Sequence, residues 1–288
     1  MTDHYLIIDG HMHVYHDKIA ERVIRSFTET HRMNPTKSLG TGTVRDVLGN
    51  MEKHHISYTV MANFSPVKSI LENNDWTICM GEQHEGLIPL VSIHPEMQVD
   101  LVKQYIQRGA RGIKMHTGIQ EFEPTDRRLT PIYKYCEKHS IPITFHCGET
   151  SKVHVNDFAK VSHILPVLAA YPDLPFILTH LAAGNPDEVL YIAKTFKNAY
   201  FDTSITLTGE HCIDRIHDDF WEEDKNAIQA FRAIGCDRIL FGSDYPFGNP
   251  GSDIRRILGL GLTEEETRML LGKNSALLYK IGIGEIGR

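Results

Sequence analysis

The sequence predicts an α/β protein that folds as a single-domain (β/α)8 barrel, a TIM barrel, over residues 1–288. Two observations predict this fold. Short apolar runs alternate with segments that carry helix signals, which is the pattern of repeated βα units. The length of 288 residues also suits one such barrel as a single unit. The eight apolar runs, which we predict to be strands, are Tyr5–Asp9, Ile56–Ala62, Leu87–Ile93, Ala110–His116, Ile141–His146, Pro175–His180, Ala199–Asp202 and Arg238–Gly242.

The segments between these strands contain signals for the starts of helices. Ser65-Pro66 and Asn185-Pro186 each place a capping residue before a proline that suits the first helical turn. Both motifs therefore predict helices that begin directly after a strand. The extended segment after the first strand, residues 17–55, is longer than one crossover needs. It is predicted to contain an extra helix and a loop over the barrel mouth.

Composition and charge narrow the class of partner. The formal net charge is −7 and Lys and Arg form no cluster, which argues against nucleic acid or an anionic membrane. A small-molecule substrate fits better. The start, MTDHYLIIDG, has no basic segment followed by a long apolar stretch, so we expect a cytoplasmic protein without a signal peptide. The five cysteines are far apart and are interpreted as free thiols, and a homo-oligomer is left open.

Polar side chains gather at the ends of the predicted strands, where TIM barrels carry their chemistry. His11 and His13 follow the first strand, and because side chains alternate along a strand, the two imidazoles share a face. Five of the eight predicted strands end in such residues, which is hard to attribute to chance. The residues are His11, His13, Lys114, His116, His146, His180 and Asp244.

The chemistry of these residues indicates a metal site. For any one of the histidines, a hydrogen bond to a neighbouring carbonyl is the simpler interpretation. Together, however, histidines and an aspartate form a set of nitrogen and oxygen ligands that suits Zn²⁺, Mn²⁺ or Fe²⁺. No cysteine accompanies them to form a structural zinc site. The strand ends therefore predict a metal centre at the mouth of the barrel.

Five motifs at these strand ends give the chain a resemblance to a known family. They are DGHMHV, GIKMHTG, PITFHCGE, FILTHLAAG and FGSDYPFG, in this order along the chain. The sequence resembles the metal-dependent amidohydrolase superfamily, and specifically its amidohydrolase 2 branch, over nearly its whole length. The resemblance implies that His11, His13, His146 and Asp244 are the metal ligands and that His180 is the catalytic histidine beside them.

The resemblance implies the catalytic machinery more clearly than the reaction, because this branch contains hydrolases and also non-oxidative decarboxylases similar to aminocarboxymuconate semialdehyde decarboxylase. A divalent ion lowers the pKa of water from about 16 toward 7. Asp244 could then take a proton from the water and pass it to the leaving group, while His180 polarises a carbonyl or holds the water in line. We expect hydrolysis of an amide, ester or lactone, because no well-placed arginine offers to capture a carboxylate. Decarboxylation of a small carboxylic acid is the alternative.

Lys114 and His116 leave the number of metal ions open. Binuclear members of the superfamily use a carboxylated lysine on this strand, and Lys114 is placed for that role. In the mononuclear branch, the same residues orient substrate or water. We favour one divalent ion, Zn²⁺ before Mn²⁺ or Fe²⁺, and expect Lys114 and His116 to bind substrate or, less readily, a second metal.

Other candidates are weaker. Asp202, at the end of the seventh predicted strand, is interpreted either as a support for the site or as an ordinary strand-end cap. Glu149 and Lys152 fall in a loop predicted to overhang the barrel mouth, where loops can meet a charged substrate, although a solvated loop residue is the simpler interpretation of Lys152.

Overall fold

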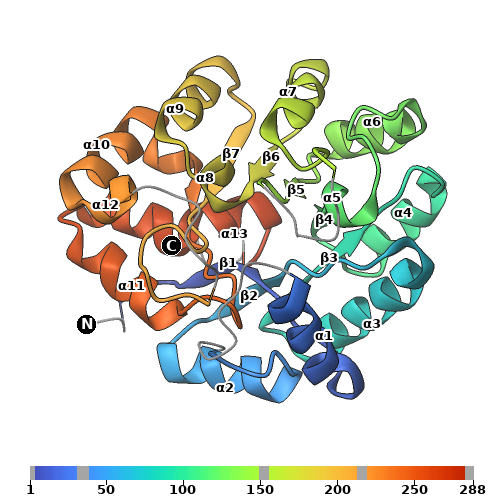
Figure 1. Ribbon diagram of the computed structural model, residues 1–288, viewed down its shortest axis with the longest axis horizontal. Coiled ribbons are helices and arrows are strands. Elements are labelled where there is room, and N and C mark those ends of the chain that lie inside the picture. The colour runs from blue at the N-terminus through green and yellow to red at the C-terminus, as the bar shows by residue number, and fades with distance from the viewer. Residues whose placement is uncertain (1–3, 31–38, 149–155, 213–218, 283–288) are drawn as a thin grey trace.

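The computed structural model describes residues 4–30, 39–148, 156–212 and 219–282, and these residues form a TIM barrel. Eight parallel strands follow one another around the sheet in the order of the sequence, and helices surround them (Figure 1). The predicted fold is therefore confirmed. The strands are β1 (Ile8–Met12), β2 (Tyr58–Met61), β3 (Leu87–Ser92), β4 (Gly112–Met115), β5 (Ile143–Phe145), β6 (Phe176–Leu178), β7 (Ala199–Asp202) and β8 (Ile239–Leu240).

Strand β1 differs from its prediction, because it begins later and continues through Gly10 to Met12. Gly10 does not interrupt the strand. Its backbone N–H donates to the carbonyl oxygen of Phe241 at 2.8 Å, next to β8, and a Cβ atom there would lie only 2.9 Å from that oxygen. Glycine therefore permits close approach of the first strand to the last. The bond from the N–H of Asp244 to the carbonyl of His11, 2.8 Å, completes the closure of the barrel.

A register shift in β1 explains which of its side chains point into the barrel. Ile8 packs with residues of other strands and with Tyr279, while the pairing of β1 with β2 shifts between Asp9 and Met12. A shift of this kind adds a residue to one strand and changes which side chains share a face. Ile8 and His11 can both point into the barrel for this reason, although strict alternation would place them on opposite faces.

The helices complete the βα pattern. The first three are α1 (Asp17–Thr30), α2 (Val44–His54) and α3 (Ile70–Gln83), and the next are α4 (Val99–Gln107), α5 (Thr117–Gln120), α6 (Thr130–His139) and α7 (Val161–Ala170). Those that follow are α8 (Thr179–Ala183), α9 (Pro186–Thr195), α10 (Asp224–Ile234), α11 (Pro250–Gly259), α12 (Glu264–Arg268) and α13 (Asn274–Tyr279). The short 3₁₀ helices are η2 (Val67–Ser69), η3 (Arg127–Leu129), η4 (Asp219–Glu222) and η5 (Cys236–Arg238), and η6 (Met269–Lys273) is a π-helix.

One of the two predicted helix starts is correct. Asn185 caps α9 by accepting a hydrogen bond from the backbone N–H of Glu188 at 3.1 Å. The predicted cap at Ser65 was wrong, because the helical segment begins at Val67 as the 3₁₀ helix η2, without a side-chain cap, and continues as α3 from Ile70. The Ser65 hydroxyl bonds to that of Ser69 at 2.6 Å instead of capping a helix.

The predicted extra helix after the first strand is present, since both α1 and α2 lie between β1 and β2. All five cysteines are free. Within the described parts of the chain, every helix is too short or too polar to cross a lipid bilayer.

The end of the barrel opposite the strand-end histidines is closed by α13. Ala276 and Tyr279 of this helix pack in one cluster with Ile8, Val60 and Leu240 of the strands. The hydroxyl of Tyr279 also bonds to that of Thr144 in β5, at 3.2 Å. Because this end is filled with side chains, the strand ends at the other face are left to carry the chemistry.

Replacing Gly272 in η6 with alanine should destabilise the protein. The added methyl group would overlap the carbonyl oxygen of Leu6, which belongs to backbone before β1 and cannot move aside cheaply. We expect the free energy of unfolding to fall by about 1–3 kcal/mol, the usual cost of overpacking. Gly49→Ala is the control, because nothing lies within 4 Å of the added atom in α2. That change should raise stability by about 0.5–1 kcal/mol. Urea denaturation measures both, and unchanged stability of Gly272→Ala would contradict the packing of η6 on this segment.

Candidate metal centre

Two histidines of β1 and its end form the first part of the site. The rings of His11 and His13 are 5.2 Å apart, centroid to centroid, and both side chains are buried. The carboxylate of Asp9 fixes the backbone around them, because its Oδ1 accepts hydrogen bonds from the N–H groups of His11 and Ser243, each at 3.0 Å. This carboxylate ties β1 to the segment after β8, from which the next site residue comes.

Asp244 follows β8 and faces both histidines. Its Oδ1 lies 3.0 Å from Nε2 of His13 and 3.4 Å from Nε2 of His11. Burial alone raises the pKa of Asp244, but the neighbouring His13 and His11 outweigh this effect and hold the pKa well below its ordinary value. Asp244 is therefore ionised, and it has a left-handed backbone with φ of 61°.

The three residues have the chemistry of a metal site. One ligand atom from each of His11, His13 and Asp244 lies within 4.8 Å of the others, all in buried positions. Oδ1 of Asp244 is buried and makes no contact with hydrogen-bond geometry among the residues that the structure describes. Burial lowers the pKa of His13, which favours the neutral imidazole that a metal requires. An ionised carboxylate oxygen facing two imidazole nitrogens is a donor set that fits a divalent ion.

His146 follows β5 but does not join this group of three in the described structure. Its Nδ1 lies 3.2 Å from Nε2 of His180, and its ring stacks on that of His116 with centroids 3.9 Å apart. Burial, followed by the neighbouring His116 and His180, lowers the pKa of His146 well below its usual value. His146 is thus a neutral imidazole whose Nδ1 is already engaged.

The sequence predicted that His180 ends a strand, but β6 stops earlier, at Leu178. The backbone turns left-handed for four consecutive non-glycine residues, His180 to Ala183, with φ between 46° and 69°. Such a conformation costs roughly 1–2 kcal/mol per residue. A carboxylate oxygen of Asp202 in β7 accepts the N–H of His180 at 2.9 Å and helps to hold the turn. Burial lowers the pKa of His180 to about 4.

Lys114 and His116 approach different parts of the site. Lys114 lies in β4, fully buried, with Nζ 3.3 Å from Nε2 of His11, and burial lowers its pKa to about 8. His116 lies just after β4, where its Nδ1 accepts a hydrogen bond from the N–H of Ile119 at 3.5 Å and caps α5. Its ring packs between those of His146 and Phe64.

Two residues of β7 and the segment after it support the site. Oδ2 of Asp202 accepts a hydrogen bond from Nδ1 of His11 at 2.9 Å, so Asp202 is more than a strand-end cap. The hydroxyl of Ser204 lies 2.8 Å from Nδ1 of His180. We did not single out Ser204 from the sequence, although Asp202 and Ser204 have the same i, i+2 spacing that marked His11 and His13. Glu149 and Lys152 lie outside the described residues.

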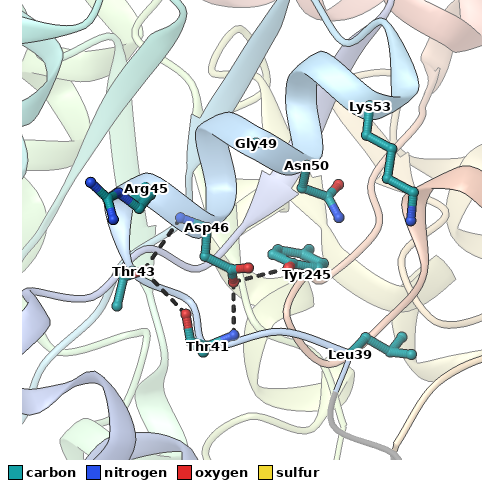
Figure 2. A pocket seen from close by; sticks show the side chains of 9 residues that line it. All are labelled: Leu39, Thr41, Thr43, Arg45, Asp46, Gly49, Asn50, Lys53 and Tyr245. Atoms are coloured by element: carbon teal, nitrogen blue, oxygen red, sulfur yellow. Dashed lines mark hydrogen bonds between the residues drawn. The ribbon is translucent and has the colours of Figure 1, made fainter.

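A separate groove of about 540 Å³ lies beside α2 (Figure 2). Asp46 stands at its centre, where its carboxylate accepts hydrogen bonds from the N–H of Thr41 at 2.7 Å and the hydroxyl of Tyr245 at 2.9 Å. The groove adjoins the site through Tyr245, the neighbour of Asp244. None of the strand-end histidines lines it, so it is not the candidate metal centre.

Comparison with solved structures finds the same fold in enzymes of two reaction types. A 5-carboxyvanillate decarboxylase from Sphingomonas paucimobilis has a TM-score of 0.70 at 12% identity, covering 96% of this chain and 99% of that chain. A dihydroxybenzoic acid decarboxylase from Polaromonas with bound manganese has a TM-score of 0.69 at 14% identity, with 96% and 97% covered. A protein described as a putative 2-pyrone-4,6-dicarboxylic acid hydrolase, from Pseudomonas putida, has a TM-score of 0.68 at 18% identity, with 97% and 99% covered.

Comparison by sequence assigns the family. No curated protein matches this chain. A family model described as Amidohydrolase matches residues 8–281, which is nearly all of the sequence and includes every strand-end residue discussed above. The resemblance seen in the five motifs is thereby confirmed. The chain belongs to the amidohydrolase family, in its amidohydrolase 2 branch, and is an enzyme.

Proposed function

We propose that this enzyme is a metal-dependent hydrolase that cleaves an amide, ester or lactone bond in a small molecule. The observation that carries the proposal is the buried Oδ1 of Asp244, which faces Nε2 of His11 and of His13 and has no hydrogen-bond partner in the described part of the chain. We assign one divalent ion to His11, His13, Asp244 and, as the family resemblance implies, His146. A bound ion would lower the pKa of water toward 7 and so supply the nucleophile at neutral pH.

The protein side chains then share the remaining work. Asp244, ionised and buried, is the base that accepts a proton from the attacking water and delivers it to the leaving atom. Neutral His180 holds the water or the substrate carbonyl in line. Because Nδ1 of His116 accepts a backbone hydrogen bond, the ring proton is on Nε2, which suits donation to substrate and not a second metal.

The same contacts bear on the number of ions. Lys114 already contacts His11, and His116 carries its proton on the nitrogen that a second metal would need. These contacts support one ion. Zinc remains our first choice for a site of histidines and a carboxylate, with manganese and iron as alternatives. That the enzyme acts in the cytoplasm, alone or as a homo-oligomer, stays a prediction from the sequence.

Decarboxylation is the second candidate, and Lys114 is the observation that favours it. A buried amine beside His11 could bind a substrate carboxylate, which is the role that an arginine would usually have in a decarboxylase. The solved structures of similar fold include both decarboxylases and a putative hydrolase, so they support either reaction.

The test combines metal content with product analysis. Protein purified without chelator should contain about one equivalent of Zn²⁺, Mn²⁺ or Fe²⁺ by elemental analysis, and His13→Ala should lose it. The metal-loaded protein is then assayed against lactones, amides and aromatic carboxylic acids, with acid release and carbon dioxide followed together. Hydrolysis without carbon dioxide supports the proposal. Release of carbon dioxide establishes the second candidate, and absence of stoichiometric metal in both proteins refutes both.

A further inference from the structure

We propose that Ser204 is a positioning residue that, together with Asp202, sets the proton positions on His180 and His146. The consequence is that His146 keeps its Nε2 unprotonated and available to a metal ion. This inference deepens the proposed function and rests on its metal site. It assigns a role to a residue that contacts two histidines of the site and is fully buried after β7.

The order of protons starts at Asp202. Although burial raises its pKa, the adjacent His11 and the hydrogen bonds it receives hold the pKa well below the ordinary value, so the carboxylate is ionised. An ionised carboxylate only accepts hydrogen bonds. Its Oδ1 accepts from the backbone N–H of His180 at 2.9 Å and from that of Ser204 at 3.2 Å. The Ser204 hydroxyl also contacts Oδ1, and its single proton must therefore point to Asp202.

The next proton lies on His180. Because the hydroxyl proton of Ser204 is given to Asp202, its oxygen can only accept from Nδ1 of His180, 2.8 Å away. The backbone carbonyl of Ser204 lies 3.3 Å from the same nitrogen, and a carbonyl also only accepts. Two independent acceptors from one residue thus place the proton on Nδ1. A neutral imidazole has a single ring proton, so with Nδ1 protonated Nε2 of His180 carries a lone pair.

The last step reaches His146. Nε2 of His180 lies 3.2 Å from Nδ1 of His146, and because Nε2 accepts, Nδ1 of His146 must donate. As a neutral imidazole, His146 then has its one ring proton on Nδ1, and its Nε2 carries a lone pair. The hydrogen bonds therefore define a direction from Asp202 to His146 through Ser204 and His180. The same carboxylate accepts from Nδ1 of His11 at 2.9 Å, which leaves Nε2 of His11 bare as well.

Without the Ser204 hydroxyl, the proton positions on His180 and His146 would no longer be fixed. His180 would keep only the longer contact to the backbone carbonyl, and it could move its proton to Nε2. It would then donate to Nδ1 of His146, and His146 would have to carry its proton on Nε2. Supporting hydrogen bonds of this kind are typically worth about 10–100-fold in metal affinity.

The test reads the proton positions directly in metal-free protein. Nitrogen-15 NMR of the histidine rings at pH 7 distinguishes the two tautomers, and His146→Asn and His180→Asn assign the signals. We expect Nδ1–H on both His146 and His180 in the wild type.

Ser204→Ala should move both toward Nε2–H and weaken Zn²⁺ binding about 10–100-fold. Ser204→Thr, which keeps the hydroxyl, should restore the tautomers. Ser275→Ala is the matched control, since this buried serine bonds to none of the site residues and its hydroxyl has no partner within the described residues.

The outcomes separate this inference from the proposed function. Nε2–H on either histidine in the wild type overturns the inference without any variant being needed. Retention of both Nδ1–H tautomers and of full Zn²⁺ affinity in Ser204→Ala also overturns it. The expected spectra in a protein that releases carbon dioxide would instead leave the inference standing and remove only the hydrolase assignment.

Discussion

Asp244→Asn is expected to reduce turnover by about 10⁴-fold, the upper end of what a positioned base contributes. The asparagine keeps the shape and one oxygen donor of Asp244 but removes the negative charge and the basic atom. Metal affinity should fall as well, because the donor set loses the carboxylate oxygen that faces Nε2 of His11 and Nε2 of His13. Turnover is measured with the substrate found in the screen, and metal affinity is measured by titration with Zn²⁺.

Excess metal distinguishes the two roles assigned to Asp244. If it acts as base as well as ligand, loading Asp244→Asn with excess Zn²⁺ or Mn²⁺ should not restore activity. Restoration to the wild-type rate with an unchanged pH profile would make Asp244 a ligand only. Asp253→Asn is the control for loss of a buried carboxyl group, because Asp253 is buried in α11 and bonds to Thr208 at 2.8 Å instead of to the histidines. That variant should retain activity.

At saturating metal, His180→Asn is expected to keep its metal and to lose turnover by about 10²–10⁴-fold. The residue is not in the group formed by His11, His13 and Asp244, to which we assign the ion, although with His11 and Asp202 it forms a second buried group of possible ligand atoms. Assays at saturating metal remove any effect of weaker binding. His163→Asn is the control, because this histidine is bonded to Glu123 in another part of the molecule. Full activity of His180→Asn on the true substrate would show that its role is wrongly assigned.

The low pKa of His180 also predicts a pH dependence of stability in metal-free protein. In the folded state this pKa is about 4, below the value of about 6.5 for an unfolded chain. As the pH falls below 6.5, the unfolded chain therefore takes up the proton first, and the folded state loses stability until the pH reaches about 4. Urea denaturation between pH 7 and 4 should show this decline, and His180→Asn should show a shallower one.

Prediction from the sequence succeeded where a local pattern fixes the structure. Alternation along a strand placed His11 and His13 on one face, and the recurrence of apolar runs gave the barrel. The first strand was predicted to end at Asp9, but β1 continues to Met12 and includes Gly10. The role of Gly10 depends on Phe241, which is distant in the sequence and reaches β1 only when the barrel closes.

The conformation of His180 could not be predicted for a similar reason. The sequence THLAAG contains no glycine at the four positions with left-handed backbone, and local propensity opposes that backbone for His180 to Ala183. It is held by contacts from β7, among them the carboxylate of Asp202. Ser204, by contrast, was within reach of the spacing argument. It was missed because a serine after a strand carries no chemical signal until its partners are known.

The closure of the barrel between β1 and β8 also bears on how the enzyme matures. His11 and His13 stand on the first strand, and Asp244 stands just beyond the last one, so the two sides of the centre meet across this seam. A ribosome releases the histidines early and the aspartate only when most of the chain has been made. An ion that binds all three residues would link the first strand to the last in the closed barrel, and its binding energy would add to the stability of the folded protein. Metal retention would therefore report that synthesis and folding are both complete.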